Sequence, residues 1–554
     1  MNLGEESMVK NYLKRRAFLK TIGGSAASLA IPNVVKAMSG KNVVDKPNII
    51  FFIADDMSYD MFNFLNNGKG KKLTPHLDQL AAEGTIMMRQ YVASPVCTPS
   101  RYSCLTGKYA SRAQNKGFLA SKELDEGMKP IGWNTHIISS DITLPKLMKK
   151  AGYVTGAVGK NHVIEAREKK LSANEDLNDP VVKKQLKENQ QQLKKAYISC
   201  GFDYAESIFP RNADALQPKE IAVHNMDWVT KGALDFLEQN TNKPFFLYFA
   251  STLTHSPSGN ETSWDADPLK TPFGYLEKPL NVLLPRHSIK ERLQKANIPF
   301  TDKNADLLWL DDCLGALIQK LQGIGQYENT IIFFFNDHGI SAKSSIYEGG
   351  VWAPSIVWRR SGFPCGKKLE TFVSNIDFAP TILDFAGASA AENMFDGKSF
   401  KSVLIGDTRK IHDSIYFELG YSRGLVKDNF KYIALRYPVG TEKWSMEKRE
   451  KILIKENELK KKQGKPVFNH DPSAPFGHLN LVPGGKMPLE NRVNEKYPCY
   501  SDKDQLYDLS TDPDEQHNLA YNPAFADKLK EMQEELKKYL QQVPGKFGEL
   551  KPNE

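Results

Sequence analysis

The sequence predicts an α/β fold in which buried strands alternate with amphipathic helices. Short, continuously apolar runs such as residues 49–54 and 330–335 are typical of strands buried on both faces of a parallel sheet. Helical patterns with recognisable first and last residues lie between these runs. Charged residues follow directly after the strands, which is where open α/β sheets bind their ligands. Together these observations predict a mainly parallel sheet with one active site at the carboxyl ends of its strands.

Each predicted strand of this sheet leads into polar residues. The predicted strands are residues 48–54, 153–158, 245–250 and 330–335. They are followed, in that order, by Asp55-Asp56, Gly159-Lys160-Asn161-His162, His255 and Asn336-Asp337-His338-Gly339. We expect these polar residues to converge, because the carboxyl ends of parallel strands share one edge of a sheet.

Predicted helices separate the strands. Thr74 is placed to cap a helix that begins at Pro75 and stops at Gly84, and a second helix covers residues 144–151. Residues 375–387 are predicted to form a further helix. The main α/β domain is therefore expected to cover residues 38–405.

After about residue 405 the composition changes, and we expect a smaller α+β subdomain over residues 406–554. Residues 414–418 and 430–435 are predicted strands. A final helix carries apolar residues at helical spacing, namely Phe525, Leu529, Met532, Leu536 and Tyr539. The Lys/Glu-rich and Pro/Gly-rich stretch at about 442–490 is predicted to be a surface insertion.

Residues 1–37 have the pattern of an export signal. Paired arginines stand in the run Lys14-Arg15-Arg16-Ala17-Phe18-Leu19-Lys20, an apolar stretch follows, and Val35-Lys36-Ala37 offers a cleavage site. This pattern favours the twin-arginine export machinery over an ordinary secretory signal or a basic anchor. We expect a protein exported from a bacterium, in the periplasm, outside the cell or at the cell surface. No later apolar run approaches the roughly 20 residues of a membrane span, so none is predicted.

Charge and cysteine content exclude some other classes. A net charge of +8 over 554 residues does not indicate a nucleic-acid partner. The polar helix predicted around residues 180–198 is interpreted as a solvated face. The six cysteines show neither C-x-x-C pairs nor zinc-module spacing, so no disulfide framework or zinc site is predicted and most should be buried thiols.

The acidic residues that follow the strands are candidates for metal binding. Asp55, Asp56 and Asp337 offer carboxylate oxygens, the ligands that hard cations prefer. An Asp-Asp pair after a strand also occurs as a helix cap. These residues alone therefore leave metal binding and capping equally open.

Cys97 opens the most specific motif of the chain. The run Cys97-Thr98-Pro99-Ser100-Arg101, continued by residues 102–108, resembles the sulfatase signature C-x-P-S-R-x-x-x-L-T-G at every fixed position. An ordinary buried thiol is the alternative interpretation of Cys97, and the proline and arginine at fixed offsets disfavour it. The resemblance extends from Pro47-Asn48 to the late Asp512-Pro513-Asp514-Glu515 and Asn518-Leu519-Ala520. The chain thus resembles the formylglycine-dependent type I sulfatases of the alkaline phosphatase superfamily, of the bacterial polysaccharide type.

This resemblance implies a fold and a mechanism. The fold is a large mixed, mostly parallel sheet sandwiched by helices, with a smaller C-terminal subdomain. A maturation enzyme would oxidise Cys97 to formylglycine, and one hydroxyl of the hydrated aldehyde would attack sulfur while the alcohol leaves. The second hydroxyl would then lose its proton, so that the aldehyde reforms and sulfate is expelled.

The resemblance also implies a role for each site residue. One Ca²⁺ ion would be held by Asp55, Asp56, Asp337, His338 and the modified Cys97. Arg101 and Lys160 would steady the diol and the sulfate, and His162 would assist the diol's proton transfers. His255 and Lys343 would hold sulfate and help to protonate the leaving oxygen. The chain departs from the family pattern at His338, where many sulfatases have Asn, and at Asn161, where an aromatic residue is common.

Three hypotheses about function follow. The first is a hydrolase that removes sulfate from a carbohydrate such as ulvan, carrageenan, fucoidan or a glycosaminoglycan fragment. The second is a formylglycine-dependent phosphonate or phosphodiester hydrolase, and the third is a carbohydrate-binding protein without catalysis. His136, Arg211, His224 and Arg423 are interpreted as either sugar contacts or structural residues.

Overall fold

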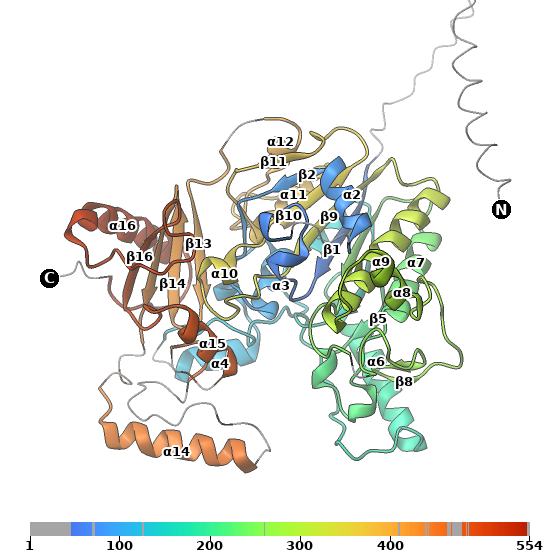
Figure 1. Ribbon diagram of the computed structural model, residues 1–554, viewed down its shortest axis with the longest axis horizontal. Coiled ribbons are helices and arrows are strands. Elements are labelled where there is room, and N and C mark those ends of the chain that lie inside the picture. Colours follow the sequence, from blue (N-terminus) through green and yellow to red (C-terminus); the bar gives the residue numbers. More distant parts are fainter. Residues whose placement is uncertain are drawn as a thin grey trace, which may run out of the picture. The chain divides into compact units, whose positions relative to one another are not determined.

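Strand β1 (Asn48–Ala54) lies inside the large sheet of the computed structural model (Figure 1). The structure describes residues 46–550 apart from 69–72, 125–126, 260, 408–409, 438–439, 441–442, 463–466, 468–478, 484 and 486. The predicted export signal at residues 1–37 lies outside the described residues.

The continuous apolar run of β1 reflects burial on both sides. Ile49, Phe51 and Ile53 point into one hydrophobic core, whereas Ile50 and Phe52 point into the other. Alternate side chains of a strand face opposite sides of the sheet, so a strand covered on both sides has no polar face.

The large sheet contains eight strands in the order β11-β2-β10-β9-β1-β6-β4-β5. Its other members are β2 (Thr85–Met87), β4 (Val154–Lys160), β5 (Tyr204–Phe209), β6 (Phe245–Ala250), β9 (Thr330–Asn336), β10 (Ser355–Arg359) and β11 (Lys367–Leu369). The five strands from β9 to β5 are mutually parallel, and β10 runs antiparallel to both of its neighbours. The predicted mixed, mostly parallel sheet is confirmed.

Helices cover both faces of this sheet. One core contains residues of α3 (Cys97–Thr106), α5 (Leu144–Lys150) and α11 (Phe378–Phe385). The other contains residues of α2 (Pro75–Glu83), α7 (Met226–Gln239), α8 (Ser288–Lys295) and α9 (Asp302–Gly323). Further helices are α4 (Lys116–Leu124), α6 (Pro180–Ser199), α10 (Glu348–Val351) and α12 (Lys401–Leu404). Two short strand pairs are also present: β3 (Gln90–Tyr91) pairs with β12 (Val373–Ser374), and β7 (Lys270–Thr271) pairs with β8 (Gly274–Tyr275).

Two predicted helix ends differ from the structure. Thr74 precedes α2, but its side chain makes no capping bond to the backbone. The carboxylate of Asp311 in α9 caps the helix instead, accepting from the N–H groups of His76 and Leu77 at 3.0 and 2.9 Å. Helix α11 starts at Phe378, because residues 375–377 form a 3₁₀ turn before it.

A four-stranded antiparallel sheet follows in the C-terminal part. It contains β13 (Ser414–Leu419), β14 (Ser422–Lys427), β15 (Phe430–Leu435) and β16 (Asp504–Asp508), and the final helix α16 (Ala526–Gln542) packs against it. The sequence predicts β13, β15 and α16 but not β14 or β16. The expected insertion includes α14 (Met446–Lys462) and ends within α15 (Pro488–Lys496). Residues from Lys46 onward form one compact unit, and the domain boundary at residue 405 stays a prediction.

None of the described helices is both long enough and apolar enough to span a membrane. The six cysteines are free thiols, and four of them, Cys97, Cys104, Cys200 and Cys313, are buried.

Candidate active site and metal centre

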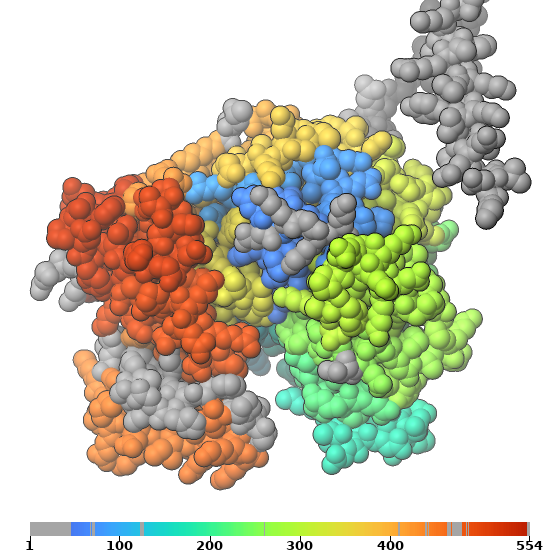
Figure 2. Space-filling view, in the orientation of Figure 1, coloured from blue at the N-terminus to red at the C-terminus, as the bar shows by residue number. Residues whose placement is uncertain are grey.

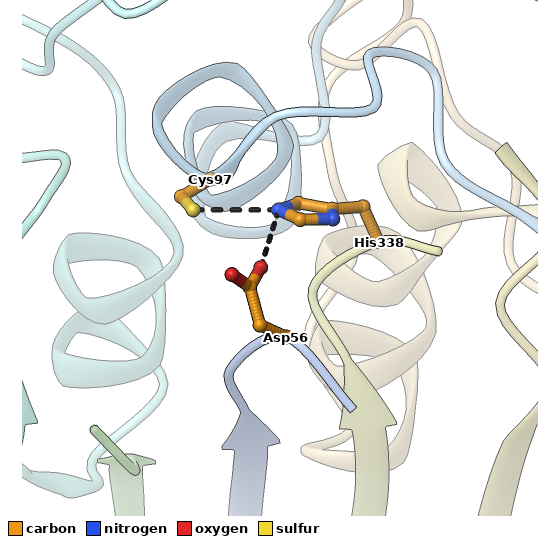
Figure 3. Close-up of side chains that lie close together, drawn as sticks. All are labelled: Asp56, Cys97 and His338. Atoms are coloured by element: carbon orange, nitrogen blue, oxygen red, sulfur yellow. Dashed lines mark hydrogen bonds and ion pairs between the residues drawn. The ribbon is translucent and has the colours of Figure 1, made fainter. Parts of the chain in front are cut away.

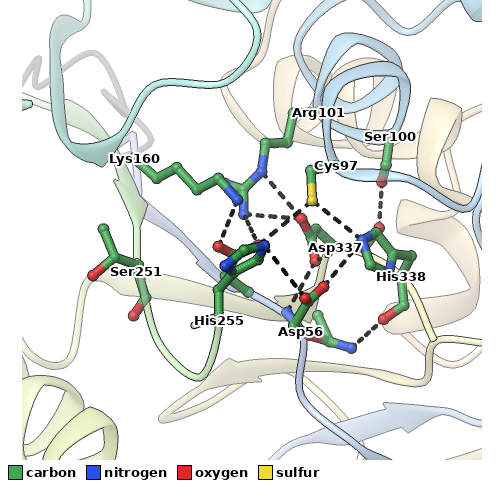
Figure 4. Close-up of polar contacts among 12 residues, drawn as sticks. Asp56, Cys97, Ser100, Arg101, Lys160, Ser251, His255, Asp337 and His338 are labelled. Carbon is green, nitrogen blue, oxygen red and sulfur yellow. Dashed lines mark hydrogen bonds and ion pairs between the residues drawn. The ribbon is translucent and has the colours of Figure 1, made fainter. Parts of the chain in front are cut away.

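The ends of β1, β4, β6 and β9 meet at one edge of the large sheet, as Figure 4 shows for the side chains they carry. Strands β1 and β9 pair in parallel with Ala54 opposite Asn336, so Asp55 and Asp337 leave the sheet side by side. The N–H of Asp55 donates to the Leu253 carbonyl at 2.9 Å, which ties the segment after β6 to the end of β1. The register of the parallel strands therefore assembles the site.

Arg101 and Lys160 neutralise the two innermost carboxylates. Arg101 Nη2 lies 3.0 Å from Asp337 Oδ2 and 3.3 Å from Asp55 Oδ1, and Lys160 Nζ lies 2.6 Å from Asp55 Oδ2. Burial by itself raises the pKa of a carboxyl, but Lys160 beside Asp55, and His338 with Arg101 beside Asp337, hold both pKa values below the ordinary range. Both side chains are therefore ionised and can serve as anionic ligands.

Asp56 presents a third carboxylate to the same point. The Lys343 ammonium lies 2.7 Å from both Asp56 oxygens, and His338 Nε2 lies 3.3 Å from Asp56 Oδ1. Burial opposes ionisation of Asp56, yet the adjacent Lys343 keeps its pKa below the ordinary value. Burial lowers the pKa of His338, which favours the neutral imidazole.

Cys97 is the first residue of the buried helix α3 and points its thiol at these groups (Figure 3). Its Sγ lies 3.3 Å from His338 Nε2, 3.7 Å from Lys343 Nζ and 3.8 Å from Asp55 Oδ1. Burial raises the pKa of the Cys97 thiol to about 12 in spite of Lys160 and Lys343. An unmodified Cys97 is thus a neutral thiol, which is a poor nucleophile.

His255 reaches the site from the segment after β6. Its Nε2 lies 3.6 Å from Asp56 Oδ2 and 3.1 Å from the side-chain amide nitrogen of Asn212, and its Nδ1 lies 3.0 Å from the Ser256 carbonyl. With an N–H at Nδ1 directed at that carbonyl, Nε2 is the acceptor that the Asn212 amide requires. The Nε2 atom therefore faces the site.

His162 stands beside the site, two residues after β4. It lines a pocket of about 370 Å³ together with His136, Glu168, Arg211 and Asn212. Among the residues that the structure describes, its buried Nδ1 atom has no hydrogen-bond partner. Burial, reinforced by the charge of Lys160, lowers the pKa of His162 well below the ordinary histidine value. The imidazole is therefore neutral near neutral pH.

The structure brings the predicted residues of the site together, with His162 in the adjoining pocket. It also adds Asn212, which was not predicted, and it gives a role to Asn336, which was expected at this edge of the sheet without one. Asn212 follows β5, which was not among the predicted strands. The signal that could have identified it is the polar run Pro210-Arg211-Asn212 after the apolar end of that strand. Asn336 contacts both site turns: its side chain donates to the Met57 and His338 carbonyls and accepts from Met57 N–H at 2.9 Å.

The structure distinguishes the four residues that the sequence left open as either sugar contacts or structural residues. His136 and Arg211 line the pocket beside His162. His224 is fully buried behind His255, with Nδ1 2.8 Å from Thr252 Oγ1 and Nε2 3.1 Å from the His255 carbonyl. Arg423 donates to the backbone carbonyls of Gly420, Ser422 and Lys129, which is a structural role.

The donor set fits a hard divalent cation. Asp55, Cys97 and Asp337 form one group whose ligand atoms lie within 4.8 Å of one another, and Asp56, Cys97 and His338 form another. Ionised carboxylates predominate, as Ca²⁺ and Mg²⁺ prefer, and the single imidazole nitrogen is the least suited of these ligands. The two groups share Cys97, so one ion beside this residue would be within reach of both.

A family model described as Sulfatase matches residues 47–388 of the chain. The chain belongs to the sulfatase family. A second model, described as the C-terminal part of N-sulphoglucosamine sulphohydrolase, matches residues 336–451. The family match includes every residue of the site described above.

Curated relatives of this family member are distant in sequence. An N-acetylgalactosamine-6-sulfatase of Canis lupus familiaris is 26% identical over 386 residues, which are 65% of this chain and 66% of the relative. The alignment thus spans just under two thirds of that protein. An ulvan-active sulfatase of Formosa agariphila is 26% identical over 528 residues, 90% of this chain and 75% of the relative.

A solved structure shares the fold. It comes from work on the metabolism of multiple glycosaminoglycans by Bacteroides thetaiotaomicron, and it matches with a TM-score of 0.58 at 20% identity. The match covers 90% of this chain and 99% of that structure. Such a similarity supports the alkaline-phosphatase-like architecture with its C-terminal antiparallel subdomain.

Proposed function

We propose that the protein is an exported sulfatase that hydrolyses a sulfate ester of a carbohydrate, with formylglycine at position 97 as its nucleophile. One observation carries the proposal: Cys97 begins a buried helix with its thiol within 4 Å of His338, Lys343 and Asp55. A sulfate ester is an anion, so its hydrolysis needs cationic groups around the reacting sulfur. Lys160, Arg101 and Lys343 supply such groups from three separate elements of the fold.

We propose that Asp55, Asp56, Asp337 and His338 hold one Ca²⁺ ion. The bound ion would supply Lewis acidity toward the sulfate oxygens. Asp337 and Asp55 also hold the Arg101 guanidinium in place. The arginine and Lys160 therefore have fixed positions from which to steady the substrate, without reorganisation during the reaction.

The histidines and Lys343 are suited to proton transfer and sulfate binding. His162 stands beside the site, and among the described residues its buried Nδ1 has no hydrogen-bond partner. We assign it the role of accepting the proton of a hydroxyl at position 97. The side chains of His255 and Lys343 both contact the carboxylate of Asp56. Lys343 is placed to bind a sulfate oxygen. His255 would bind sulfate and give a proton to the leaving alcohol only in its protonated form, with the N–H at Nε2 turned from Asn212 toward the substrate.

Two experiments at position 97 test the proposed nucleophile. Mass spectrometry of the Cys97 peptide from the exported protein should show the loss of mass that converts a thiol to an aldehyde. Cys97→Ala should abolish sulfate release and leave the fold intact, because the surrounding side chains are held by one another. Full activity of that variant would rule out the proposed nucleophile.

A comparison of reaction rates on different substrates distinguishes the proposed function from its alternatives. The matured protein should release sulfate from at least one of ulvan, carrageenan, fucoidan and glycosaminoglycan oligosaccharides, and should cleave an aryl sulfate faster than an aryl phosphodiester. A faster phosphodiester reaction would favour the phosphonate or phosphodiester hydrolase. Binding of a sugar without release of sulfate would favour the non-catalytic alternative.

Export is part of the proposal. The pattern of residues 1–37 supports transport by the twin-arginine machinery to the periplasm, the cell surface or the medium. Replacing Arg15 and Arg16 with lysines should retain the protein in the cytoplasm. Unchanged export of that variant would rule out the twin-arginine route.

A further inference from the structure

A second pocket continues from the one beside His162. The strand β5 ends at Phe209, and the next residues lead from the site outward: Asn212 contacts His255, and Arg211 lies one position before it. The pocket that contains His162 shares Glu168, Pro210, Arg211 and Ala215 with a neighbouring pocket of about 120 Å³. We call these the inner and the outer pocket. They adjoin through these shared residues, and the inner one is lined by His162, so we refer to the two together as the groove.

Arg211 is fixed at the junction of the two pockets. Its Nη2 lies 2.7 Å from Glu168 Oε2, and the Glu168 side chain is only 10% exposed whereas that of Arg211 is 37% exposed. The glutamate therefore orients the guanidinium of Arg211, which lines both pockets. A planar guanidinium held in this way is well suited to bind a carboxylate or a sulfate.

The segment that carries Lys169 and Lys170 is held firmly in place. The buried side chain of Asn189 in α6 accepts from Lys169 N–H at 3.0 Å and donates to its carbonyl at 2.8 Å. Lys170 lines the outer pocket, and among the described residues no carboxylate lies within ion-pair distance of its ammonium. Lys169 is already paired with Glu188 at 3.1 Å. Lys170 is thus the uncompensated charge of the outer pocket.

The rest of the outer pocket suits a sugar ring. Leu171, Leu186, Pro272 and Phe273 give it an apolar wall. Helix α6, which contributes to this wall, lies at the surface in Figures 1 and 2 and carries further lysines at positions 183, 184, 187, 194 and 195. An anionic chain that leaves the groove would meet this positive surface. The sequence predicts only a solvated face for this helix, whereas Leu186 and Asn189 on its other face line the outer pocket.

We infer that the outer pocket binds the sugar next to the one that carries the scissile sulfate, and that Arg211 and Lys170 recognise an anionic group on that neighbouring sugar. This inference rests on the proposed function. The shared chemistry is a carboxylate or a second sulfate ester, both of which match a fixed guanidinium and a free ammonium. The substrate class is therefore a polyanionic oligosaccharide.

Binding to the Cys97→Ala protein tests the inference without turnover. Three probes are compared by calorimetry: a disaccharide of sulfated N-acetylgalactosamine and glucuronate, the methyl ester of its glucuronate, and a carrageenan disaccharide with sulfate on both sugars. The first and third probes carry an anionic group on the second sugar. They should bind about ten- to a hundred-fold more tightly than the methyl ester, which has none there. A preference for the first probe identifies the carboxylate as the recognised group, and a preference for the third identifies the second sulfate. Equal dissociation constants for all three probes would overturn the inference.

Matched variants locate the effect. In the same background, Lys170→Gln and Arg211→Gln should each reduce the preference for a charged probe over the ester by about ten-fold. Arg167→Gln and Lys530→Gln, which change exposed cations that do not line the groove, are the controls and should keep the preference. An equal loss in the controls would assign the preference to general surface charge and contradict the inference.

Failure of the proposed function gives a different result. A matured protein, with the aldehyde verified at position 97, that releases sulfate from none of the probes and from no aryl sulfate contradicts the sulfatase proposal. The calorimetric comparison would still decide whether the outer pocket recognises a neighbouring anion.

Discussion

The ammonium of Lys343 lies 2.7 Å from each carboxylate oxygen of Asp56. Both residues are proposed to serve the substrate, one through the metal and the other through the sulfate. In this arrangement the ammonium and a cation compete for the same two oxygens. Binding of the ion therefore requires Lys343 to share Asp56 or to turn toward the sulfate.

Lys343→Met should separate metal binding from turnover. Removing the ammonium eliminates a repulsive charge, so Ca²⁺ should bind about ten-fold more tightly or better. Turnover of an aryl sulfate should fall by about 10²–10³, since a cation that stabilises the transition state is lost. Calcium titration by calorimetry and steady-state kinetics measure the two effects. Weaker calcium binding in this variant would show that the lysine supports the site.

Asn336→Ala should weaken the site without removing a proposed ligand. The Asn336 side chain connects the turn at Met57 to the backbone of His338, so its loss lets the two ligand-bearing turns shift. Residues that orient metal ligands typically contribute about 10–100-fold in metal affinity or activity. Calcium affinity and turnover should fall together by about this factor. A variant with unchanged calcium affinity would show that the turns keep their positions without the asparagine.

Much of the fold and most of the site could be predicted from the sequence. Strand β1 and strand β6 have the predicted bounds, because strands covered on both sides are continuous apolar runs with polar residues beyond them. Cys97 and Arg101 could be recognised in the sequence because they occupy fixed positions of the C-x-P-S-R motif.

Other features depend on contacts that no local pattern carries. Strand β14 has the sequence Ser-Arg-Gly-Leu-Val-Lys, which lacks a long apolar run, and its pairing with β13 and β15 makes it a strand. The cap of α2 comes from Asp311, which is more than 200 residues away in the chain. Likewise, the role of Asn212 depends on β5 lying beside β4 at the edge of the sheet.

His224→Gln should reduce the pH dependence of folding stability. Burial lowers the pKa of His224 to about 4 from the ordinary value of 6.5. The folded protein therefore holds His224 neutral while the unfolded chain takes up a proton below about pH 6.5. This group contributes stability above its unfolded pKa that is lost as the pH falls from about 6.5 toward 4, by ~3 kcal/mol in total.

Denaturant unfolding at several pH values between about 7 and 4 measures this effect. The decline in unfolding free energy should be smaller in His224→Gln than in the native protein. His287→Gln changes an exposed histidine and is the matched control. An unchanged decline in the His224 variant would mean that other groups account for the acid sensitivity.

Lys431→Met should destabilise the connection between the C-terminal sheet and the site. The buried Lys431 ammonium of β15 lies 2.9 Å from Glu348 Oε1 and 3.2 Å from Glu515 Oε1, and Glu515 Oε2 accepts from Glu348 N–H at 2.6 Å. Burial raises the pKa of Glu515 against the effect of Lys431. Without the ammonium, the buried Glu515 carboxyl group and the partly exposed Glu348 carboxyl group would face each other with no cation between them.

Loss of this partner should lower the free energy of unfolding by about 3–5 kcal/mol. The double variant Lys431→Met/Glu515→Gln removes one of the two facing charges and should recover part of that loss, which distinguishes electrostatics from a packing defect. Denaturant unfolding of both variants measures the difference. A double variant no more stable than the single one would assign the loss to packing around the lysine chain.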